Sequence, residues 1–290
     1  MRIFADSNPI AASLYFLAVS GIAMFSANPI ISAISLIGAV VLFLVNNGKK
    51  SLSYHLFSLL LFAIMSLVNP LVSHNGATVL FVINNNPVTL EALIYGICSS
   101  VTIIAVLYLF RSFTQVMTSD KLLYIFGVLS PKLALILSMA LRYVSLFGTQ
   151  IKKVQASQKA LGLYKDDNIV DSFRGGIRVF SVMITWALEN GIITADSMAA
   201  RGYGIGKRSR FSLFRFKAED VLIISCTLLF SALTIYGING AEFEFYPYIS
   251  APEIDIKLVV GYISYGAMNL LPVIICVKEE LKWKYLRSKI

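Results

Sequence analysis

Long apolar stretches separated by short polar segments dominate the pattern of hydrophobic and polar positions along this chain. Six of them reach roughly 16 to 21 residues, close to the about 20 that a helix needs to cross the hydrocarbon core of a bilayer. They cover residues 9–27, 29–45, 52–72, 90–110, 221–236 and 258–277. The pattern therefore predicts an all-α membrane protein with about six transmembrane helices.

The polar segments differ sharply in lysine and arginine content, which marks the cytoplasmic side of a membrane protein. Sixteen of these residues lie in 111–217, two follow the second apolar stretch, and five lie in the tail after the last stretch. Segments 69–89 and 239–256 contain none. We expect both termini in the cytoplasm, and these two segments outside together with the turn at Asn28.

Residues 111–217 form the most informative segment, because they are basic and still rich in apolar residues. Leu133–Phe147 has the hydropathy of a seventh span, yet it contains Arg142, and four lysines downstream would lie outside if it crossed. We expect helices at or under the membrane interface, with a re-entrant hairpin as the alternative. The predicted organisation is residues 1–110 with four spans, this cytoplasmic or interfacial helical region, and residues 218–290 with two spans and a basic tail.

Two helices in this region are predicted to end in the same way. One runs from about Gly148 to Leu161 and the other from about Gly176 to Arg201, and glycine, the usual residue just past a last helical turn, follows each. Each helix also carries two alanines spaced four residues apart, which lets two backbones approach closely. We expect the helices to cross at these small faces, at Ala156 and Ala195.

Composition excludes several classes of protein. Hydrophobic residues make up 57% of the chain and charged residues only 14%, against roughly 25% charged in a soluble domain. The net charge of +9 is therefore a topology signal and not a sign of nucleic-acid binding. The three cysteines lie far apart inside apolar stretches, which suits neither disulfides nor a zinc site. We expect no catalytic residue, metal ligand or cofactor in this chain.

The sharpest motif is Ala195-Asp-Ser-Met-Ala-Ala-Arg-Gly-Tyr-Gly204. Arg201 falls in the last turn of the predicted helix, where a cation interacts favourably with the helix dipole. The simpler interpretation is a capping charge. The alternative is a guanidinium fork on a rigid helix tip that enters a groove on a partner protein.

This string resembles the second signature of the EcfT family, the transmembrane coupling component of energy-coupling factor (ECF) importers. Asn69-Pro-Leu71, Thr89–Gly96 and Leu141-Arg142-Tyr143 resemble other family features, so the similarity runs from about Pro9 to Lys217. The resemblance implies two crossed coupling helices whose tips dock into two ABC-type ATPase subunits, which bind the ATP and magnesium. It also implies a small membrane substrate-binding subunit, uptake of a vitamin or metal ion, and a multi-pass location in a prokaryotic plasma membrane.

Each tip in this family is built around alanine-arginine-glycine, and only one tip of this chain follows that pattern. The second tip comprises Ala199, Ala200, Arg201 and Gly202. The first tip comprises Gln158, Lys159, Ala160, Leu161 and Gly162. Leu161 stands where arginine is expected, and Lys159 is no equivalent substitute because it lacks the planar fork. The asymmetry suggests two different ATPase partners.

The helix ahead of the first tip offers an apolar surface on which we expect the substrate-binding subunit to sit. The residues of this surface are Leu133, Leu137, Leu141 and Tyr143. Within the spans, ionisable residues are almost absent, whereas transporters that carry the solute themselves usually have charges or broken helices at mid-membrane. The sequence therefore favours a non-catalytic coupling subunit. A stand-alone permease or receptor is the alternative, and it predicts solute binding by the purified chain; a lipid-modifying enzyme would need an acidic pair or a His/Asp cluster.

Overall fold

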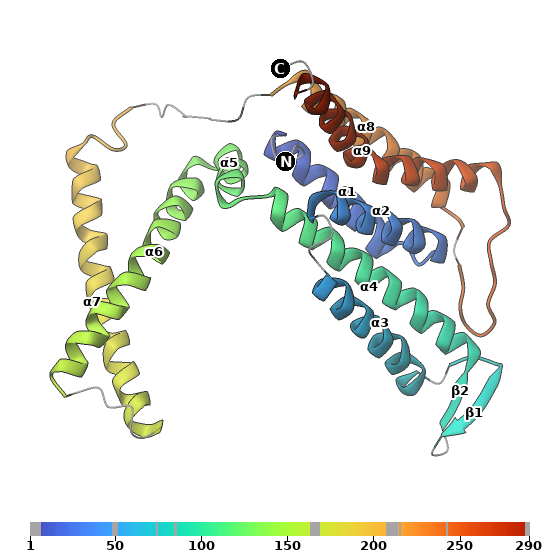
Figure 1. The fold of residues 1–290 in the computed structure, drawn as a ribbon, viewed down its shortest axis with the longest axis horizontal. Coiled ribbons are helices and arrows are strands. Elements are labelled where there is room, and N and C mark those ends of the chain that lie inside the picture. Colours follow the sequence, from blue (N-terminus) through green and yellow to red (C-terminus); the bar gives the residue numbers. More distant parts are fainter. Residues whose placement is uncertain are drawn as a thin grey trace. The chain divides into compact units, whose positions relative to one another are not determined.

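The computed structural model describes residues 7–47, 52–73, 75–83, 86–162, 169–206, 214, 216–241 and 243–287. The protein is an all-α membrane protein with one small β-hairpin (Figure 1). Its helices in the described ranges are α1 Pro9–Phe25, α2 Pro29–Asn47, α3 Leu52–Val72, α4 Leu90–Val116, α5 Ser119–Leu129, α6 Pro131–Ala160, α7 Ile169–Ala200, α8 Ala218–Ile238 and α9 Ile256–Arg287. All six predicted spans are therefore helices.

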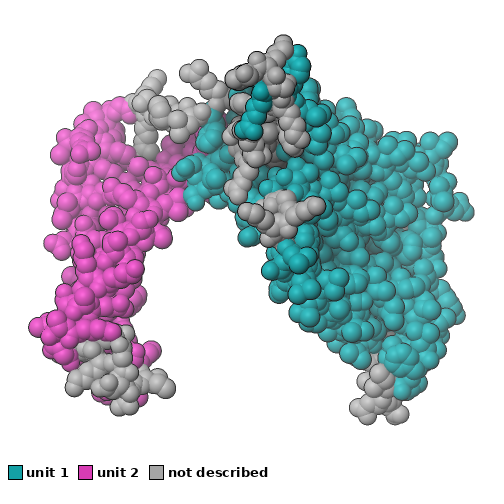
Figure 2. Space-filling model, in the orientation of Figure 1, with its two compact units in different colours: residues 1–122, 214–290 teal, residues 123–213 magenta. Residues whose placement is uncertain are grey.

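The chain divides into two compact units (Figure 2). Residues 1–122 and 214–290 form the first unit, which contains the six predicted spans, and residues 123–213 form the second unit, with α6 and α7. The second unit begins later in the chain than the expected helical region, because α4 continues beyond Phe110 to Val116.

Asparagine followed by proline begins each of the first two helices. The Asn8 side chain accepts a hydrogen bond from the Ile10 N–H at 3.0 Å, and the Asn28 side chain accepts one from the Ile30 N–H at 3.1 Å. Asparagine is a favoured N-cap residue, and proline suits the first helical position because the N–H it lacks would have no helical partner. The predicted turn at Asn28 is confirmed, since α1 ends at Phe25 and α2 begins directly after the asparagine.

Helix α4 packs against α1, α2 and α3, and α9 packs against α2 and α8. Aromatic rings fill the space between them, and Phe43 contacts the Tyr108 ring edge-on at 5.2 Å. Several polar groups in this core are paired. The Tyr265 hydroxyl lies 2.6 Å from the Ser35 hydroxyl and donates to the Val19 carbonyl at 3.2 Å. Such pairing is needed in a bilayer, where an unsatisfied polar group is costly.

The two last spans, which only hydropathy supports in the sequence, form a close helix pair. A Cβ added to Gly237 on α8 would lie 2.7 Å from the Gly261 Cα on α9. Beside this contact the Thr234 and Ser264 hydroxyls lie 3.0 Å apart. Small residues let membrane helices approach closely, and hydroxyl pairs link them.

In the part of the chain that the structure describes, seven helices are long and apolar enough to cross a membrane, and they are α2, α3, α4, α6, α7, α8 and α9. Helix α1 is apolar but has only 17 residues. Large apolar side chains face outward on these helices, as Leu56 and Leu59 do on α3. An apolar surface of this extent suits lipid and not water, so the chain is a multi-pass membrane protein.

Residues 69–89, which the sequence predicts to be a loop, contain an antiparallel hairpin of β1 Val79–Ile83 and β2 Asn86–Thr89. The residues of β1 are β-branched, leucine or phenylalanine, which favours a strand. The buried Glu91 carboxylate, in the first turn of α4, accepts a hydrogen bond from the Thr78 hydroxyl at 2.7 Å. The hairpin is thereby held to the end of a predicted span.

Candidate functional site at two helix ends

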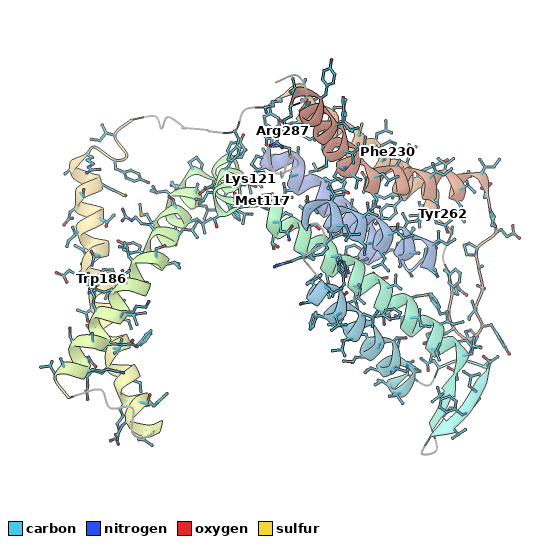
Figure 3. All side chains as sticks on the ribbon, in the orientation of Figure 1. Met117, Lys121, Trp186, Phe230, Tyr262 and Arg287 are labelled. Carbon is cyan, nitrogen blue, oxygen red and sulfur yellow. The ribbon has the colours of Figure 1, made fainter. Side chains whose placement is uncertain are left out.

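The second unit consists mainly of two long helices, α6 and α7, which pack against each other. The Tyr143 hydroxyl of α6 donates to the Asn190 carbonyl of α7 at 3.3 Å and lies 3.1 Å from the Thr194 hydroxyl. The Phe147 ring, one turn further along α6, meets the Trp186 ring at 5.7 Å between centroids; Trp186 is labelled in Figure 3. The later of the two α6 residues, Phe147, contacts the earlier of the α7 residues, Trp186. The two helices are therefore antiparallel.

This contact corrects the predicted crossing at alanine faces. Ala156 and Ala195 are both exposed, and the contacts between the helices lie at aromatic side chains further from the tips. Aromatic rings bury more apolar area than methyl groups, and edge-to-face pairs add about 0.5–1.5 kcal/mol. Sequence reasoning missed Phe147 and Trp186, although Tyr143 and Phe147 are spaced four residues apart and so share one helix face.

The predicted start of the first helix is also wrong, since α6 is continuous from Pro131 to Ala160. Gly148 lies inside it, and a side chain there would meet nothing within 4 Å. Glycine inside a helix lowers helix stability by only about 1 kcal/mol relative to alanine. The neighbouring helix-forming residues offset this loss, so the helix continues through Gly148. The segment Leu133–Phe147 and the first tip therefore belong to one rigid rod.

The end of α7 closes in a Schellman motif. The Tyr203 N–H donates to the Met198 carbonyl and the Gly202 N–H to the Ala199 carbonyl, both at 3.0 Å. Gly202 takes the left-handed conformation that this motif requires, with φ of 74°. Arg201, the residue before this glycine, is exposed, so an ordered helix end carries an exposed guanidinium group.

The end of α6 has the same backbone arrangement with a different side chain. Gly162 has φ of 66°, and its N–H donates to the Lys159 carbonyl at 3.0 Å. Leu161 takes the position that Arg201 has at the other tip, and 72% of its surface is exposed. Gln158, by contrast, is only 7% exposed, so it supports this tip from within and is not a surface contact.

The antiparallel packing puts the two tips at opposite ends of the helix pair. At about 1.5 Å per residue, α6 continues for about 20 Å beyond Phe147 to Ala160, and α7 for about 20 Å beyond Trp186 to Ala200. The tips are therefore up to about 40 Å apart along the helix axes. The two tips are therefore separate surfaces of the helix pair.

Charge differs between the two helices as well. Helix α6 carries five lysines or arginines and no acidic residue, and Lys152 and Lys153 are exposed in its last three turns. Helix α7 has acidic residues among its basic ones, including exposed Glu189 and Asp196. The first tip is thus an apolar side chain at the end of a basic rod, and the second is a single arginine on a mixed-charge helix.

The expected contact surface for a membrane partner is present in part. Leu133 and Leu141 are exposed on α6, and Leu137 between them is partly exposed. Tyr143 does not belong to this surface, because its hydroxyl binds α7. The three leucines are spaced four residues apart and form one stripe along the helix.

The structure describes one of the two histidines of the chain. His55 Nδ1 lies 2.7 Å from the Tyr108 hydroxyl inside the bundle, and His74 lies outside the described residues. Among the residues that the structure describes, there is no group of three or more His, Cys, Asp or Glu side chains that could hold a metal ion.

Most of the chain matches one known family. The model of the CbiQ family, described as cobalt transport protein, matches residues 4–213. The match includes α1 to α7 and both helix tips, and it stops before α8. No curated protein matches the chain.

Proposed function

Because the chain belongs to the CbiQ family, the family of ECF transporter T components, we propose that it is the transmembrane coupling subunit of an ECF-type importer. In this role it transmits the motion of two ABC-type ATPase subunits to a small membrane-embedded substrate-binding subunit. The partner ATPases bind ATP and magnesium, and this chain catalyses no step. The observation that carries the proposal is Arg201, exposed at the ordered end of α7 within the matched segment.

The chemistry of the second tip suits a protein groove. A guanidinium group offers five N–H donors in a planar fork, which matches carboxylates and backbone carbonyl oxygens. The Schellman motif holds the backbone at Arg201 in one conformation, so little entropy is lost when the side chain docks. The groove on the ATPase subunit is therefore expected to be lined with acceptor oxygens.

The first tip calls for a different groove. Leu161 is apolar and exposed, so its burial in a partner is favourable, and the nearby Lys152 and Lys153 favour an acidic rim around that pocket. The two tips thus suit two different ATPase subunits.

The crossing lets the two tips act together. A ring pair and hydrogen bonds join α6 to α7 near Tyr143 and Trp186, so a pull on either tip turns both helices. When the two ATPases close on ATP, they move the two ends of this pair towards each other, and the pair transmits that motion to the membrane layer.

We place α6 and α7 at the cytoplasmic membrane face, with both termini in the cytoplasm. The support is the five cations of α6 together with the lysine-free segments 69–89 and 239–256. The leucine stripe on α6, exposed at Leu133 and Leu141, is offered to the substrate-binding subunit. The family description makes cobalt the first solute to test among metal ions and vitamins.

The experiment that tests the proposal is co-purification with the ABC-type ATPases, from co-expressing cells in mild detergent. The variant Arg201→Glu reverses the charge at the tip and is expected to abolish recovery of at least one ATPase, while the chain still inserts into the membrane. Arg174→Glu is the matched control, because Arg174 is exposed on the same helix away from its tip. Normal recovery of both ATPases with Arg201→Glu would contradict the proposed role of this tip.

A further inference from the structure

Four helix ends meet where the chain leaves the first unit. Helix α4 ends at Val116, and α5 begins two residues later, after Met117 and Thr118. Two ionisable side chains are buried at this place (Figure 3 labels Met117 and Lys121). Lys121, in the first turn of α5, is 4% exposed, and Asp220, in the first turn of α8, is 2% exposed.

Both buried groups bind the same short segment in front of α1. The Lys121 Nζ donates to the Ser7 carbonyl at 3.4 Å. The Asn8 N–H donates to the Asp220 Oδ1 at 2.8 Å, and the Lys217 N–H donates to the Asp220 Oδ2 at 2.9 Å. Residues 7 and 8 therefore lie between the beginnings of α5 and α8 and link the two.

Neither group is placed for helix stability alone. A lysine in the first turn of a helix opposes the helix dipole, and its burial adds a desolvation cost. For Asp220, the helix start explains one carboxylate oxygen, which accepts from Lys217 in a capping box. The other oxygen is used for Asn8, a residue 212 positions away in sequence. Both groups are thus used for contacts between distant segments.

These contacts lie at the base of both connections to the second unit. The chain enters that unit at Leu123, just after Lys121, and re-enters the first unit at Phe214, just before α8. Helix α1, which follows Asn8, also packs on α4 through the Phe16 and Phe113 rings, whose centroids are 5.5 Å apart. These two connections join the second unit covalently to the membrane helices.

We propose that Ser7, Asn8, Lys121 and Asp220 form a clasp that sets the direction in which both connections leave the membrane bundle. The clasp makes α5 and the start of α8 move with α1 and α4, so that motion of α6 and α7 is transmitted to the bundle and not absorbed in the connections. The four are positioning residues. Their role in transport rests on the proposed function, but the constraint on α5 does not.

The constraint is measured by the distance between two spin labels on the full chain in lipid nanodiscs. One label is placed at Leu17 on α1 and the other at Leu129 at the end of α5, both exposed positions. The three native cysteines are replaced by serine. The protein with an intact clasp is expected to give one narrow distance distribution. Loss of one hydrogen bond to a charged group is expected to raise the fraction of molecules in which α5 has come away from α1 by about tenfold.

The sharpest pair of variants is Asn8→Pro against Asn8→Ala. Both remove the side chain that caps α1, but only proline removes the N–H that binds Asp220. The φ of Asn8 is −57°, which suits proline, and the ring carbon that replaces the N–H hydrogen would also push the Asp220 carboxylate away. The spin-label distribution is expected to broaden for Asn8→Pro and not for Asn8→Ala.

Charge-removing variants extend the test. Lys121→Met and Asp220→Asn are expected to broaden the distribution, whereas Lys132→Met and Glu219→Gln, at exposed positions, are the matched controls. If a charge-removing variant fails to insert, the comparison of Asn8→Pro with Asn8→Ala decides alone. In both of these variants Asp220 keeps its charge and its hydrogen bond from the Lys217 N–H. Equal widths for Asn8→Pro and Asn8→Ala would overturn the clasp.

A second readout separates the clasp from the proposed function. In the complex with the ATPases, the intact clasp is expected to keep the distance between the labels nearly constant when ATP binds, and Asn8→Pro is expected to let ATP shift this distance while ATP hydrolysis continues. A shift of the same size in Asn8→Pro as in Asn8→Ala would overturn the role of the clasp in coupling. Broadening of the distribution by Asn8→Pro in the chain alone, with no recovery of the ATPases by the chain, would leave the clasp standing and reject the proposed function.

Discussion

Replacing Gly202 with alanine tests whether the left-handed end of α7 holds the second tip in order. Its φ of 74° is a conformation that costs a residue with a Cβ about 1–2 kcal/mol. The added Cβ would meet only the Ile205 Cδ1, at 3.4 Å, which is an ordinary contact. No clash adds to the conformational cost, so we expect the last turn to be destabilised by about 1 kcal/mol.

The measurement is hydrogen exchange at the amides that close the helix. The amides of residues 202 and 203 are held by the carbonyls of Ala199 and Met198. Since about 1.4 kcal/mol corresponds to a factor of ten in an equilibrium, local opening of these amides is expected to become roughly five- to tenfold more frequent. Amides in the middle of α7 are expected to exchange as before, because the change acts only on the last turn.

The control is the same substitution inside the same helix. Gly191 lies within α7, and a Cβ there would meet nothing within 4 Å. Gly191→Ala is therefore expected to stabilise the helix by about 0.5–1 kcal/mol and to slow exchange near it. If Gly202→Ala also slowed exchange at the tip, the assigned Schellman end and the ordered presentation of Arg201 would both be refuted.

Two further substitutions probe the packing of each unit. Gly38→Ala would bring a Cβ within 2.6 Å of the buried Asn269 Oδ1, so a loss of about 1–3 kcal/mol in the thermal unfolding of the protein in detergent is expected. Gly21→Ala, with nothing within 4 Å of its Cβ, is the control, and equal stability of the two would contradict this packing. Tyr143→Phe removes the hydroxyl that binds α7, and hydrogen exchange in α7 should show a loss of about 1 kcal/mol; unchanged protection near Thr194 would contradict the crossing.

The spans were predictable because their signal is length and apolar composition, and no tertiary information is needed to read it. Residues 69–89 show where this approach fails. Their lack of charge indicates the side of the membrane, but whether Val79–Ile83 forms a strand depends on pairing with Asn86–Thr89. Strand propensity depends strongly on such context, so the sequence alone predicts a loop where the structure has a hairpin.

The candidate site shows the same division between local and non-local information. The glycines that end both helices were predictable, because a left-handed residue is a local requirement. The crossing of α6 and α7 was not, since alanine spacing only permits close approach, and the rings of Phe147 and Trp186 decide where the helices meet. Likewise, nothing in the sequence around Lys121 or Asp220 indicates that both bind the segment in front of α1.

The two tips share a backbone conformation and differ at one side chain. Leu161 and Arg201 each stand directly before a glycine in the left-handed region, so partner discrimination has to come from the side chains. Burial of Arg201 in a pocket shaped for leucine would leave a charge unpaired, and burial of Leu161 in a groove lined with acceptor oxygens would leave those unpaired. If the tips bind ATPase grooves as proposed, each tip is therefore expected to reject the other's groove. Under the proposed function, this favours two different ATPase subunits over two copies of one, because identical grooves would fit at most one tip well.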